Sequence, residues 1–273
     1  MSDLALTETL ERLLLHVWPS VETVPASAGP AWVLRFAHGY SSRANSAAAI
    51  SAGAVVGPAI LREAENYFSS HGLPATFRIT PLVTPASIPV LKAHGYVRKD
   101  EAITMTASLD ARSTRLVGDI VMRDEADDQW LSGVTALNSD ESKRNPAHLK
   151  TITSRMEQPV AFASIAHQGI ASGYAICAIR DGWAELGSII IAPQARGRGL
   201  GRKLVAGLLH WASENGAARA FLQVDADNSA AIALYRSLGF ADCYAYSTWR
   251  KPRPAVAAVT GRGERPGPRS GPT

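Results

Sequence analysis

The feature that most constrains the fold of this chain is a weak internal repeat. When the sequence is shifted along itself by 144 residues without a gap, several glycines and apolar residues coincide. The coinciding pairs are Gly53 and Gly197, Gly57 and Gly201, Gly72 and Gly216, Phe77 and Phe221, Ile88 and Ile232, Gly95 and Gly239, and Tyr96 and Phe240. Both segments have the order helix, glycine turn, strand, second helix, Gly-aromatic pair and strand. Self-similarity at a fixed offset predicts a structural duplication.

The first copy contains three helix patterns and three strand patterns. Residues 4–17 carry leucines at helical spacing. Residues 58–70 begin with Pro58 and are soon followed by Gly72, which are typical start and stop signals of a helix. A further short helix is predicted over residues 87–93. Strands are predicted over residues 31–36, 75–80 and 102–109.

The second copy is longer and contains a predicted meander. Apolar strand patterns over residues 160–166, 173–179 and 184–191 are joined by short turns, which predicts three antiparallel strands. Further strands are predicted over residues 120–123, 219–224 and 242–249. Helices are predicted over residues 125–137, 146–156, 199–214 and 228–237.

Composition narrows the class of protein. The chain has 273 residues, of which 46% are hydrophobic and 19% charged, so it is expected to form one large or two small globular domains. Two cysteines, Cys177 and Cys243, are too few for a disulfide framework or a cysteine zinc site, and we expect no metal. The N-terminus lacks the pattern of a secretion signal, and no stretch is apolar enough to span a membrane. These observations favour a cytoplasmic protein.

The net charge of +4 resides in the C-terminal segment. Residues 251–273 contain five basic residues and one acidic residue, so the charges of residues 1–250 sum to zero. A neutral body argues against a nucleic-acid partner as the explanation of the high isoelectric point. The segment is rich in Pro, Gly and Arg, and we expect it to be disordered, either as a solvated tail or as an arm for a partner.

A glycine-rich turn carries the strongest functional signal. The segment 189–201 places three glycines, two residues apart, between a predicted strand and a predicted helix. Glycine permits tight backbone conformations, and the first N–H groups of a helix have no partner within it. With Arg196 and Arg198 nearby, these groups predict an anion site suited to a diphosphate. The sequence lacks the Gly-Lys-Ser/Thr of a Walker A loop and the leading βαβ unit of a Rossmann fold. A turn without a ligand is the alternative.

A second segment makes this interpretation more specific. Residues 221–240 read FLQVDADNSAAIALYRSLGF. The spacing R-x-x-G-x-G at residues 196–201 resembles the acyl-CoA diphosphate signature of the GCN5-related N-acetyltransferase (GNAT) superfamily, and residues 228–240 resemble its downstream helix and strand. The resemblance covers residues 120–249. It implies an α/β (α+β) fold of two GNAT-like units, each a mixed, mostly antiparallel sheet flanked by helices.

The resemblance also implies how acyl-CoA is bound. The backbone of residues 196–201 would hold the diphosphate, and the strand 188–191 would pair with the pantetheine arm. A splay between this strand and residues 221–224 would admit the thioester. Asn228 would contact the arm, with an ordinary helix N-cap as the alternative. The implied binding residues are Ile189, Ile190, Ile191, Arg196, Gly197, Arg198, Gly199, Leu200, Gly201, Asn228 and Tyr235.

Two residues are candidates for proton transfer. Tyr235 matches the position that often protonates the departing CoA thiolate in this superfamily, and proton transfer of this kind contributes about 10²–10⁴-fold to a rate; a core aromatic is the alternative. Glu185 lies near the start of the central strand, where the superfamily often places a carboxylate, and is the candidate general base. Asp225 or solvent is the alternative base. No cysteine lies at an expected nucleophile position, so direct attack in a ternary complex is expected.

The N-terminal copy departs from the signature. At the 144-residue offset, Arg196, Arg198 and Gly199 fall on Ala52, Ala54 and Val55. We therefore expect a single acyl-CoA site per chain, in the second copy. The layout resembles tandem-GNAT acetyltransferases of the mycothiol-synthase type. Residues 32–46 also resemble the N-terminal half of a group of bacterial tandem acetyltransferases. There, Arg43 and Asn45 either face an acceptor cleft or belong to a loop that satisfies its own hydrogen bonds.

The predicted domains are a degenerate GNAT-like unit over residues 1–108, a catalytic unit over residues 109–250 and the tail over residues 251–273. The predicted function is transfer of an acyl group, expected to be acetyl from acetyl-CoA, to a primary amine. The acceptor is a small molecule or a peptide, which the sequence does not identify. A non-catalytic acyl-CoA sensor or scaffold is the alternative, and a monomer or a homodimer is expected.

Overall fold

The N-terminal half, residues 1–108, supplies three helices and five strands in its described part. The computed structural model describes residues 3–29, 31–109 and 120–252. The helices of this half are α1 (Asp3–Val17), α2 (Pro58–Ser70) and α3 (Ser87–Ala93). Its strands are β1 (Glu22–Pro25), β2 (Trp32–Phe36), β3 (Ala47–Ala49), β4 (Thr76–Ile79) and β5 (Val97–Ser108). The three predicted helices are confirmed, and α2 begins at its proline.

The C-terminal half, residues 109–250, supplies the other elements. Its helices are α4 (Asp128–Ala136), α5 (Pro146–Thr153), α6 (Leu200–Glu214) and α7 (Ser229–Arg236), with short 3-10 turns over Glu141–Lys143 and Pro193–Ala195. Its strands are β6 (Ile120–Arg123), β7 (Val160–His167), β8 (Ile170–Arg180), β9 (Trp183–Ile191), β10 (Arg219–Asp225) and β11 (Ala241–Arg250). Side chains of Asp127, Asn145 and Asn228 cap α4, α5 and α7, which explains where these helices begin.

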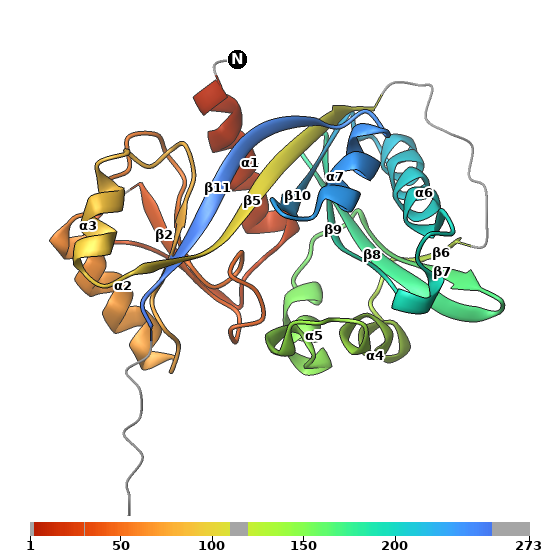
Figure 1. Cartoon of the computed structure of the whole chain (residues 1–273), viewed down its shortest axis with the longest axis horizontal. Coiled ribbons are helices and arrows are strands. Elements are labelled where there is room, and N and C mark those ends of the chain that lie inside the picture. Colours follow the sequence, from red (N-terminus) through yellow and green to blue (C-terminus); the bar gives the residue numbers. More distant parts are fainter. Residues whose placement is uncertain (1–2, 30, 110–119, 253–273) are drawn as a thin grey trace, which may run out of the picture.

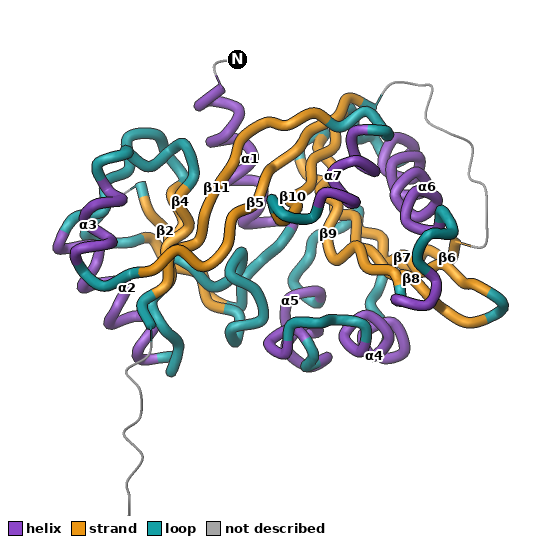
Figure 2. Tube along the Cα trace, in the orientation of Figure 1, coloured by secondary structure: helices purple, strands orange, loops and turns teal. Residues whose placement is uncertain are grey.

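One sheet runs through the whole molecule. Its eleven described strands lie in the order β1-β2-β3-β4-β11-β5-β10-β9-β8-β7-β6. Only β3 with β4 and β9 with β10 pair in parallel, and all other neighbours are antiparallel, including the predicted meander of β7, β8 and β9. Figure 2 shows this sheet between the helices. The predicted α/β class with a mixed, mostly antiparallel sheet is confirmed.

Strands β5 and β11 exchange between the halves. β11 pairs with β4 and β5 of the N-terminal half, and β5 pairs with β10 of the C-terminal half. Figure 1 shows these two long strands side by side through the middle of the molecule. In each half, a parallel pair is therefore followed by a strand from the other half. The two units share one sheet, which the separate reading of each copy did not anticipate.

Three apolar clusters hold the helices to this sheet. One joins α6 and α7 to β7, β8, β9 and β10, and one joins α2 and α3 to β2, β3 and β4. The third joins α1 to α4, α5 and β8, and contains Leu10 and Trp130. Because α1 of the N-terminal half packs against β8 of the C-terminal half, the halves share a core as well as a sheet.

In the structure, the two copies do not correspond at one constant offset along the sequence. Ala47 pairs with Phe77 as Glu185 pairs with Phe221, so Ala47 takes the place of Glu185 at an offset of 138 rather than 144. Gly53 follows Ala47 by six positions, whereas Gly197 follows Glu185 by twelve. The N-terminal half lacks six residues after its central strand and has gained six before it. The gapless alignment is therefore wrong over residues 37–51, where two opposite length changes cancel.

The structure differs from the remaining sequence predictions mainly at element ends. β1 and β3 were not predicted, and β5 begins five residues before its predicted start. The predicted tail, residues 251–273, lies outside the described residues from position 253 onward. In the described ranges, no helix combines the length and apolarity needed to cross a membrane.

Candidate active site

The site is built where two parallel strands of the C-terminal half separate. β9 and β10 pair only as far as Leu186 with Leu222. Beyond this point β9 continues along β8, and β10 continues along β5. Over residues 187–191, the edge of β9 that faces away from β8 has no strand partner within the described chain, so the N–H and C=O groups on that edge can pair with an extended ligand. The predicted splay is confirmed, and Ile189, Ile190 and Ile191 lie on its open edge.

A β-bulge bends β9 at the splay. Tyr174 pairs with Ile190 but Ile176 pairs with Gly187, so β9 contains one extra residue between these pairs. Ser188, inside the bulge, has a φ of 50°. A Cβ at Gly187 would lie 3.1 Å from Glu185 Oε2, so the glycine leaves room for the carboxyl group beside the splay.

The glycine-rich turn leads from β9 into α6. Gly197 and Gly199 both have a φ of 74°, the left-handed conformation that favours glycine, and a Cβ at either position would meet no atom within 4 Å. The first intrahelical bond of α6 runs from the Lys203 N–H to the Gly199 carbonyl. The preceding N–H groups, including those of Leu200 and Gly201, have no partner within the helix.

This turn fits a diphosphate. It is exposed, and unpaired N–H groups, the positive end of the α6 dipole and two arginine side chains meet there. Arg196 Nε donates to the Ile191 carbonyl at 3.2 Å, which ties the turn to the end of β9. Arg198 is exposed beside it. The anion site predicted for the diphosphate of acyl-CoA thus has a donor set of the right chemistry.

Asn228 and Tyr235 lie on α7 beside the splay. Asn228 Oδ1 accepts the N–H of Ala231 at 3.1 Å, so the residue is an N-cap that also lines the cavity described below. Tyr235 is 6% exposed, packs against Phe240 and lines the same cavity. Burial raises the pKa of the Tyr235 phenol to about 12, which keeps its proton in place at neutral pH.

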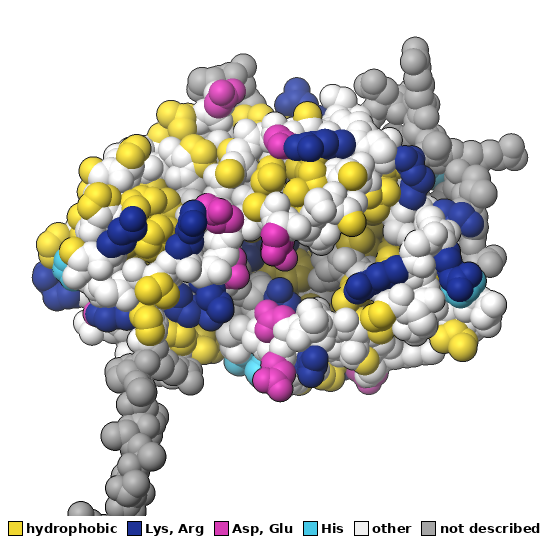
Figure 3. Space-filling view, in the orientation of Figure 1, with side chains coloured by type: hydrophobic (Ala, Val, Ile, Leu, Met, Phe, Trp, Pro, Cys, Tyr) yellow, Lys and Arg dark blue, Asp and Glu magenta, His cyan; other side chains and the backbone are white. Residues whose placement is uncertain are grey.

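A cavity of about 690 Å³ lies between the two halves. The C-terminal half contributes the splay and the end of β10, and the N-terminal half contributes the loop 39–43 and part of β5. Figure 3 shows a hollow near the middle of the molecule, with basic and acidic side chains around it. Both halves therefore build the space that an acceptor would enter. In the described residues no three His, Cys, Asp or Glu side chains are grouped as metal ligands.

Residues 7–248 match the protein family described as "Probable histone acetyltransferase Rv0428c C-terminal". The chain belongs to this acetyltransferase family. It is 31% identical over 235 residues to the uncharacterized N-acetyltransferase YobR of Bacillus subtilis, covering 85% of this chain and 93% of the relative.

Solved structures with the same fold include a GCN5-related N-acetyltransferase from Kribbella flavida, with a TM-score of 0.66 at 18% identity, covering 94% of this chain and 98% of that one. A tandem GNAT protein from the clavulanic acid biosynthesis pathway has a TM-score of 0.57 at 16% identity, covering 82% of this chain and 78% of that one. The predicted membership of the GNAT superfamily is confirmed, and the protein is an N-acetyltransferase.

The acetyltransferase carries a fully buried carboxyl group beside its splay. Glu185 on β9 is 0% exposed, and its neighbours Leu186 and Gly187 line the cavity. Its Oε1 accepts a hydrogen bond from Arg43 Nη1 at 2.9 Å, whereas Oε2 has no partner among the described residues. Burial raises the pKa of Glu185 to about 7, although Arg43 opposes the shift. Asp225, the alternative base, is exposed at the cavity end of β10.

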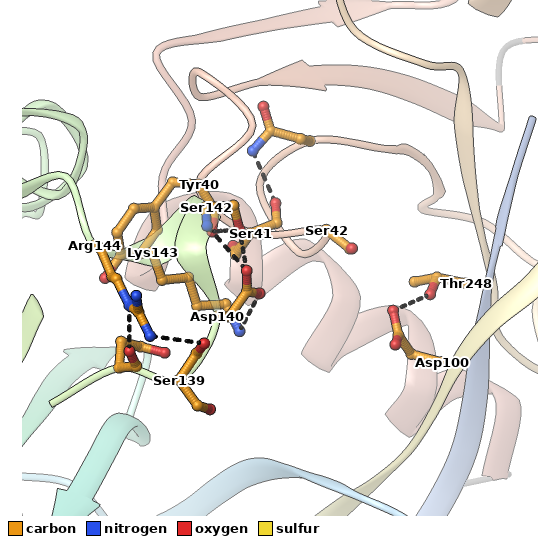
Figure 4. A network of polar contacts seen from close by, with 12 residues as sticks. Tyr40, Ser41, Ser42, Asp100, Ser139, Asp140, Ser142, Lys143, Arg144 and Thr248 are labelled. Carbon is orange, nitrogen blue, oxygen red and sulfur yellow. Dashed lines mark hydrogen bonds and ion pairs between the residues drawn. The ribbon is translucent and has the colours of Figure 1, made fainter. Parts of the chain in front are cut away.

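Polar residues that no motif identified form another wall of the acetyltransferase cavity. Figure 4 shows the loop around Tyr40 facing the segment 139–144, with Asp100 and Thr248 on the neighbouring strands. Ser142 Oγ lies 2.8 Å from Asp140 Oδ1 and 3.5 Å from the Tyr40 carbonyl oxygen, and its single proton can be donated to either one, so the two halves are in contact across the cavity. Thr248 Oγ1 donates to Asp100 at 3.0 Å. These residues become neighbours only through the fold, so spacing in the sequence gave no signal.

The two candidates in the N-terminal loop have different roles in the acetyltransferase. Asn45 is 7% exposed and binds its own loop: Oδ1 accepts the N–H groups of Ala37 and Gly39 at 2.7 and 2.8 Å, and Nδ2 donates to the Ser41 carbonyl at 2.8 Å. Arg43 lines the cavity and reaches Glu185. The loop therefore satisfies its own hydrogen bonds through Asn45 and presents Arg43 to the cleft.

The equivalent place in the N-terminal half is closed. The Ala54 N–H donates to the Leu82 carbonyl at 3.0 Å, and the Thr84 N–H donates to the Ala54 carbonyl at 2.8 Å, so the turn after β3 pairs with the segment after β4. The Ala52 N–H, at the position equivalent to Arg196, donates to Glu8 Oε1 of α1 at 2.6 Å. In the described N-terminal half, no open strand edge therefore lies before the turn, and the carboxylate of Glu8 accepts one of the N–H groups of the turn.

Sequence reasoning also missed the bulge of the acetyltransferase. The pair Gly187-Ser188 interrupts a strand of apolar residues, and an isolated glycine in a strand pattern is a known signal for a bulge. This signal would have located the point where β9 leaves β10.

Proposed function

We propose that this N-acetyltransferase transfers an acetyl group from acetyl-CoA to a primary amine by direct attack in a ternary complex. The observation that carries the proposal is the combination of a splayed β9 edge, a left-handed glycine turn at the start of α6 and a cavity between them and the N-terminal half. An extended thioester and a diphosphate match the first two features, and an amine acceptor matches the third.

In this proposal the C-terminal half holds the acyl-CoA. The backbone of Ile189, Ile190 and Ile191 pairs with the pantetheine arm, as a neighbouring strand would. The turn 196–201 binds the diphosphate through its N–H groups, with Arg196 and Arg198 adding positive charge. Asn228 and Tyr235 contact the arm from α7. The donor set of the turn and the open strand edge support this assignment.

The acyl-CoA supplies the acetyl thioester. The acceptor nitrogen forms the new C–N bond while the C–S bond breaks, and the products are an amide and CoA. Glu185 takes the proton that the amine loses, through one water molecule because its side chain lies behind the cavity wall. Tyr235 gives its proton to the departing sulfur. The burial of both groups supports these roles, since a carboxyl group with a pKa of about 7 and a protonated phenol are suited to accept and to donate a proton at neutral pH.

We further propose one acyl-CoA site per chain, with residues 109–250 as the catalytic unit and residues 1–108 as a degenerate copy. The closed turn at Ala54 and the contact of Ala52 with Glu8 support this division. The cleft between the halves supports the interpretation that the degenerate copy helps to hold the acceptor.

Calorimetric titration with acetyl-CoA tests the proposal with a matched pair of variants. Gly199→Ala and Gly53→Ala both place a Cβ at a residue of left-handed φ, 74° and 79°, and both Cβ atoms meet open space. Each substitution therefore costs about 1–2 kcal/mol of backbone strain. We expect one site per chain in the parent and in Gly53→Ala, and an affinity at least about tenfold lower in Gly199→Ala, since two or three dipole contacts are disturbed.

Equal losses in the two variants would mean that the effect is backbone strain and that the turn 196–201 does not bind the diphosphate. Binding of two acetyl-CoA molecules per chain would mean that the N-terminal turn also binds acyl-CoA, and that the proposal of a single site is wrong. No saturable binding to the parent protein would overturn the proposal as a whole.

A further inference from the structure

We propose that Arg43 is a positioning residue of the active site: a loop of the N-terminal half supplies the guanidinium that orients the carboxyl group of Glu185 in the C-terminal half. This inference rests on the proposed role of Glu185 as the base. The two residues are 142 positions apart in the sequence, and Arg43 Nη1 donates to Glu185 Oε1 at 2.9 Å.

The pair leaves one carboxylate oxygen available. Glu185 is 0% exposed, whereas the Arg43 side chain is 20% exposed and lines the cavity. Oε1 is held by Arg43, and Oε2 is buried without a partner among the described residues. Gly187 lies in the cavity wall. Among the described glycines, it is the one at which an added Cβ would come within 4 Å of this oxygen. A water molecule that enters at Gly187 would therefore contact Oε2 and could pass the proton of the amine to it.

The loop that presents Arg43 is held from several sides. Arg35 is buried and donates to the Arg43 carbonyl at 2.9 Å and to Ser20 Oγ at 2.9 Å. Arg43 lies over the ring of Trp18 at 5.6 Å from its centroid. Asn45 closes the loop through its three backbone contacts described above. An arginine on such a loop loses little conformational freedom when it binds a carboxylate, which favours a fixed orientation.

The position of this loop in the repeat supports the inference. Residues 37–46 contain the six residues that the N-terminal half has gained, and the six residues it lacks correspond to the strand edge that lines the splay of the C-terminal half. The same half has thus no equivalent of the acyl-CoA edge and has instead a longer loop that reaches the other half's carboxyl group.

The ion pair has a defined electrostatic effect. A fully buried carboxyl group without a cation would keep its proton at neutral pH and would not accept another one. Among the described residues, two titratable groups interact electrostatically with this pair: Arg35 with Arg43, and the thiol of Cys177 on β8 with Glu185. Both residues are present in the parent and in the Arg43 variants, so a difference in the pKa of Glu185 between these proteins measures the effect of Arg43.

Carbon-13 NMR of protein labelled at the glutamate carboxyl carbons measures this titration directly, with Glu185→Gln to assign the signal. We expect Arg43→Gln to raise the pKa of Glu185 by about one to three units, the usual effect of losing an adjacent arginine. Arg43→Lys retains the charge and is expected to keep at least half of the effect. Arg12→Gln makes the same change of net charge at an exposed position that contacts Ser51 and not Glu185, and is expected to leave the titration unchanged.

An unchanged or lowered pKa of Glu185 in Arg43→Gln would overturn the proposal, as would an equal shift in Arg12→Gln. Titration with acetyl-CoA separates this result from the proposed function. Arg43→Gln is expected to bind acetyl-CoA as the parent does, because Arg43 does not belong to the turn or to the strand edge. If the parent protein fails to bind acetyl-CoA while the NMR shift occurs, the proposed function fails and the electrostatic coupling of the pair remains.

Discussion

Replacing Glu185 by glutamine is expected to stabilise the protein above neutral pH. Burial raises the pKa of this carboxyl group from its ordinary value of 4.5 to about 7. Glutamine has nearly the same shape, retains an oxygen that can accept from Arg43, and does not titrate. The comparison therefore isolates the free energy of keeping a charge on this buried group, since all other titrating groups are common to the two proteins.

The direction and size of the effect follow from proton linkage. Below about pH 4.5 the carboxyl group is protonated in both the folded and the unfolded chain, so it carries no charge and its burial does not lower the free energy of unfolding through this effect. Between pH 4.5 and 7 the unfolded chain has released the proton and the folded protein has kept it, so the stability of the parent falls as the pH rises. The gap of about 2.5 units corresponds to about 3 kcal/mol at full extent, at about 1.36 kcal/mol per unit. Above pH 7 the difference stays constant.

Urea unfolding at pH 5, 6, 7 and 8, followed by tryptophan fluorescence, measures this difference. The free energy of unfolding of Glu185→Gln, minus that of the parent, is expected to increase by about 2–3 kcal/mol across this range, with equal denaturant slopes in the two proteins. Glu214→Gln, at the exposed end of α6, controls for the loss of one negative charge. A difference that stays flat from pH 5 to 8 would refute the reasoning, because Glu185 would then titrate alike in the folded and unfolded states.

Two further predictions concern catalysis and the contact between the halves. With an amine acceptor identified by screening, Tyr235→Phe is expected to lower the transfer rate by about 10²–10⁴-fold while acetyl-CoA affinity measured by calorimetry stays the same; a matching loss of affinity would mean that Tyr235 only shapes the cavity. Glu11→Ala is expected to destabilise the protein by about 3–5 kcal/mol in urea unfolding, because buried Arg78 would lose its carboxylate partner and Tyr244 its acceptor; a loss below about 1 kcal/mol would mean that this pair does not fix α1 to the sheet.

The elements with local signals were predictable from the sequence. α2 and α3 run over residues 58–70 and 87–93 as predicted, and β6 over residues 120–123. Pro58 and Gly72 mark the ends of α2 as predicted, and Gly72 has a left-handed φ of 67°. β3 was missed because three alanines carry no alternation of polar and apolar residues. The turn 196–201 was equally local, since its glycines and the following helix pattern are contiguous.

The exchange of β5 and β11 was not predictable in this way. Residue patterns report which face of a strand is buried, and they do not report which strand lies beside it. β5 was predicted as a strand of the first unit, but its neighbours in the sheet, β10 and β11, both come from the second unit. The same limit applies to Glu185: its position in the central strand was predictable, whereas its complete burial and its contact with Arg43 depend on a loop 142 positions away.

The cancelled length changes explain both why the repeat was visible and why its functional meaning was hidden. Six residues gained before β3 and six lost after it leave the offset of 144 intact on either side, so glycines and helices still coincide. A strand edge that pairs with a ligand needs an extended segment between the central strand and the glycine turn, and only the C-terminal half has it. Replacing Ala52 and Ala54 by arginine and Val55 by glycine is therefore not expected to create a second acyl-CoA site, because the backbone of residue 54 would still pair with Leu82 and Thr84. If the chain has the single acyl-CoA site proposed above, the N-terminal half differs from the C-terminal half in backbone length before it differs in side chains.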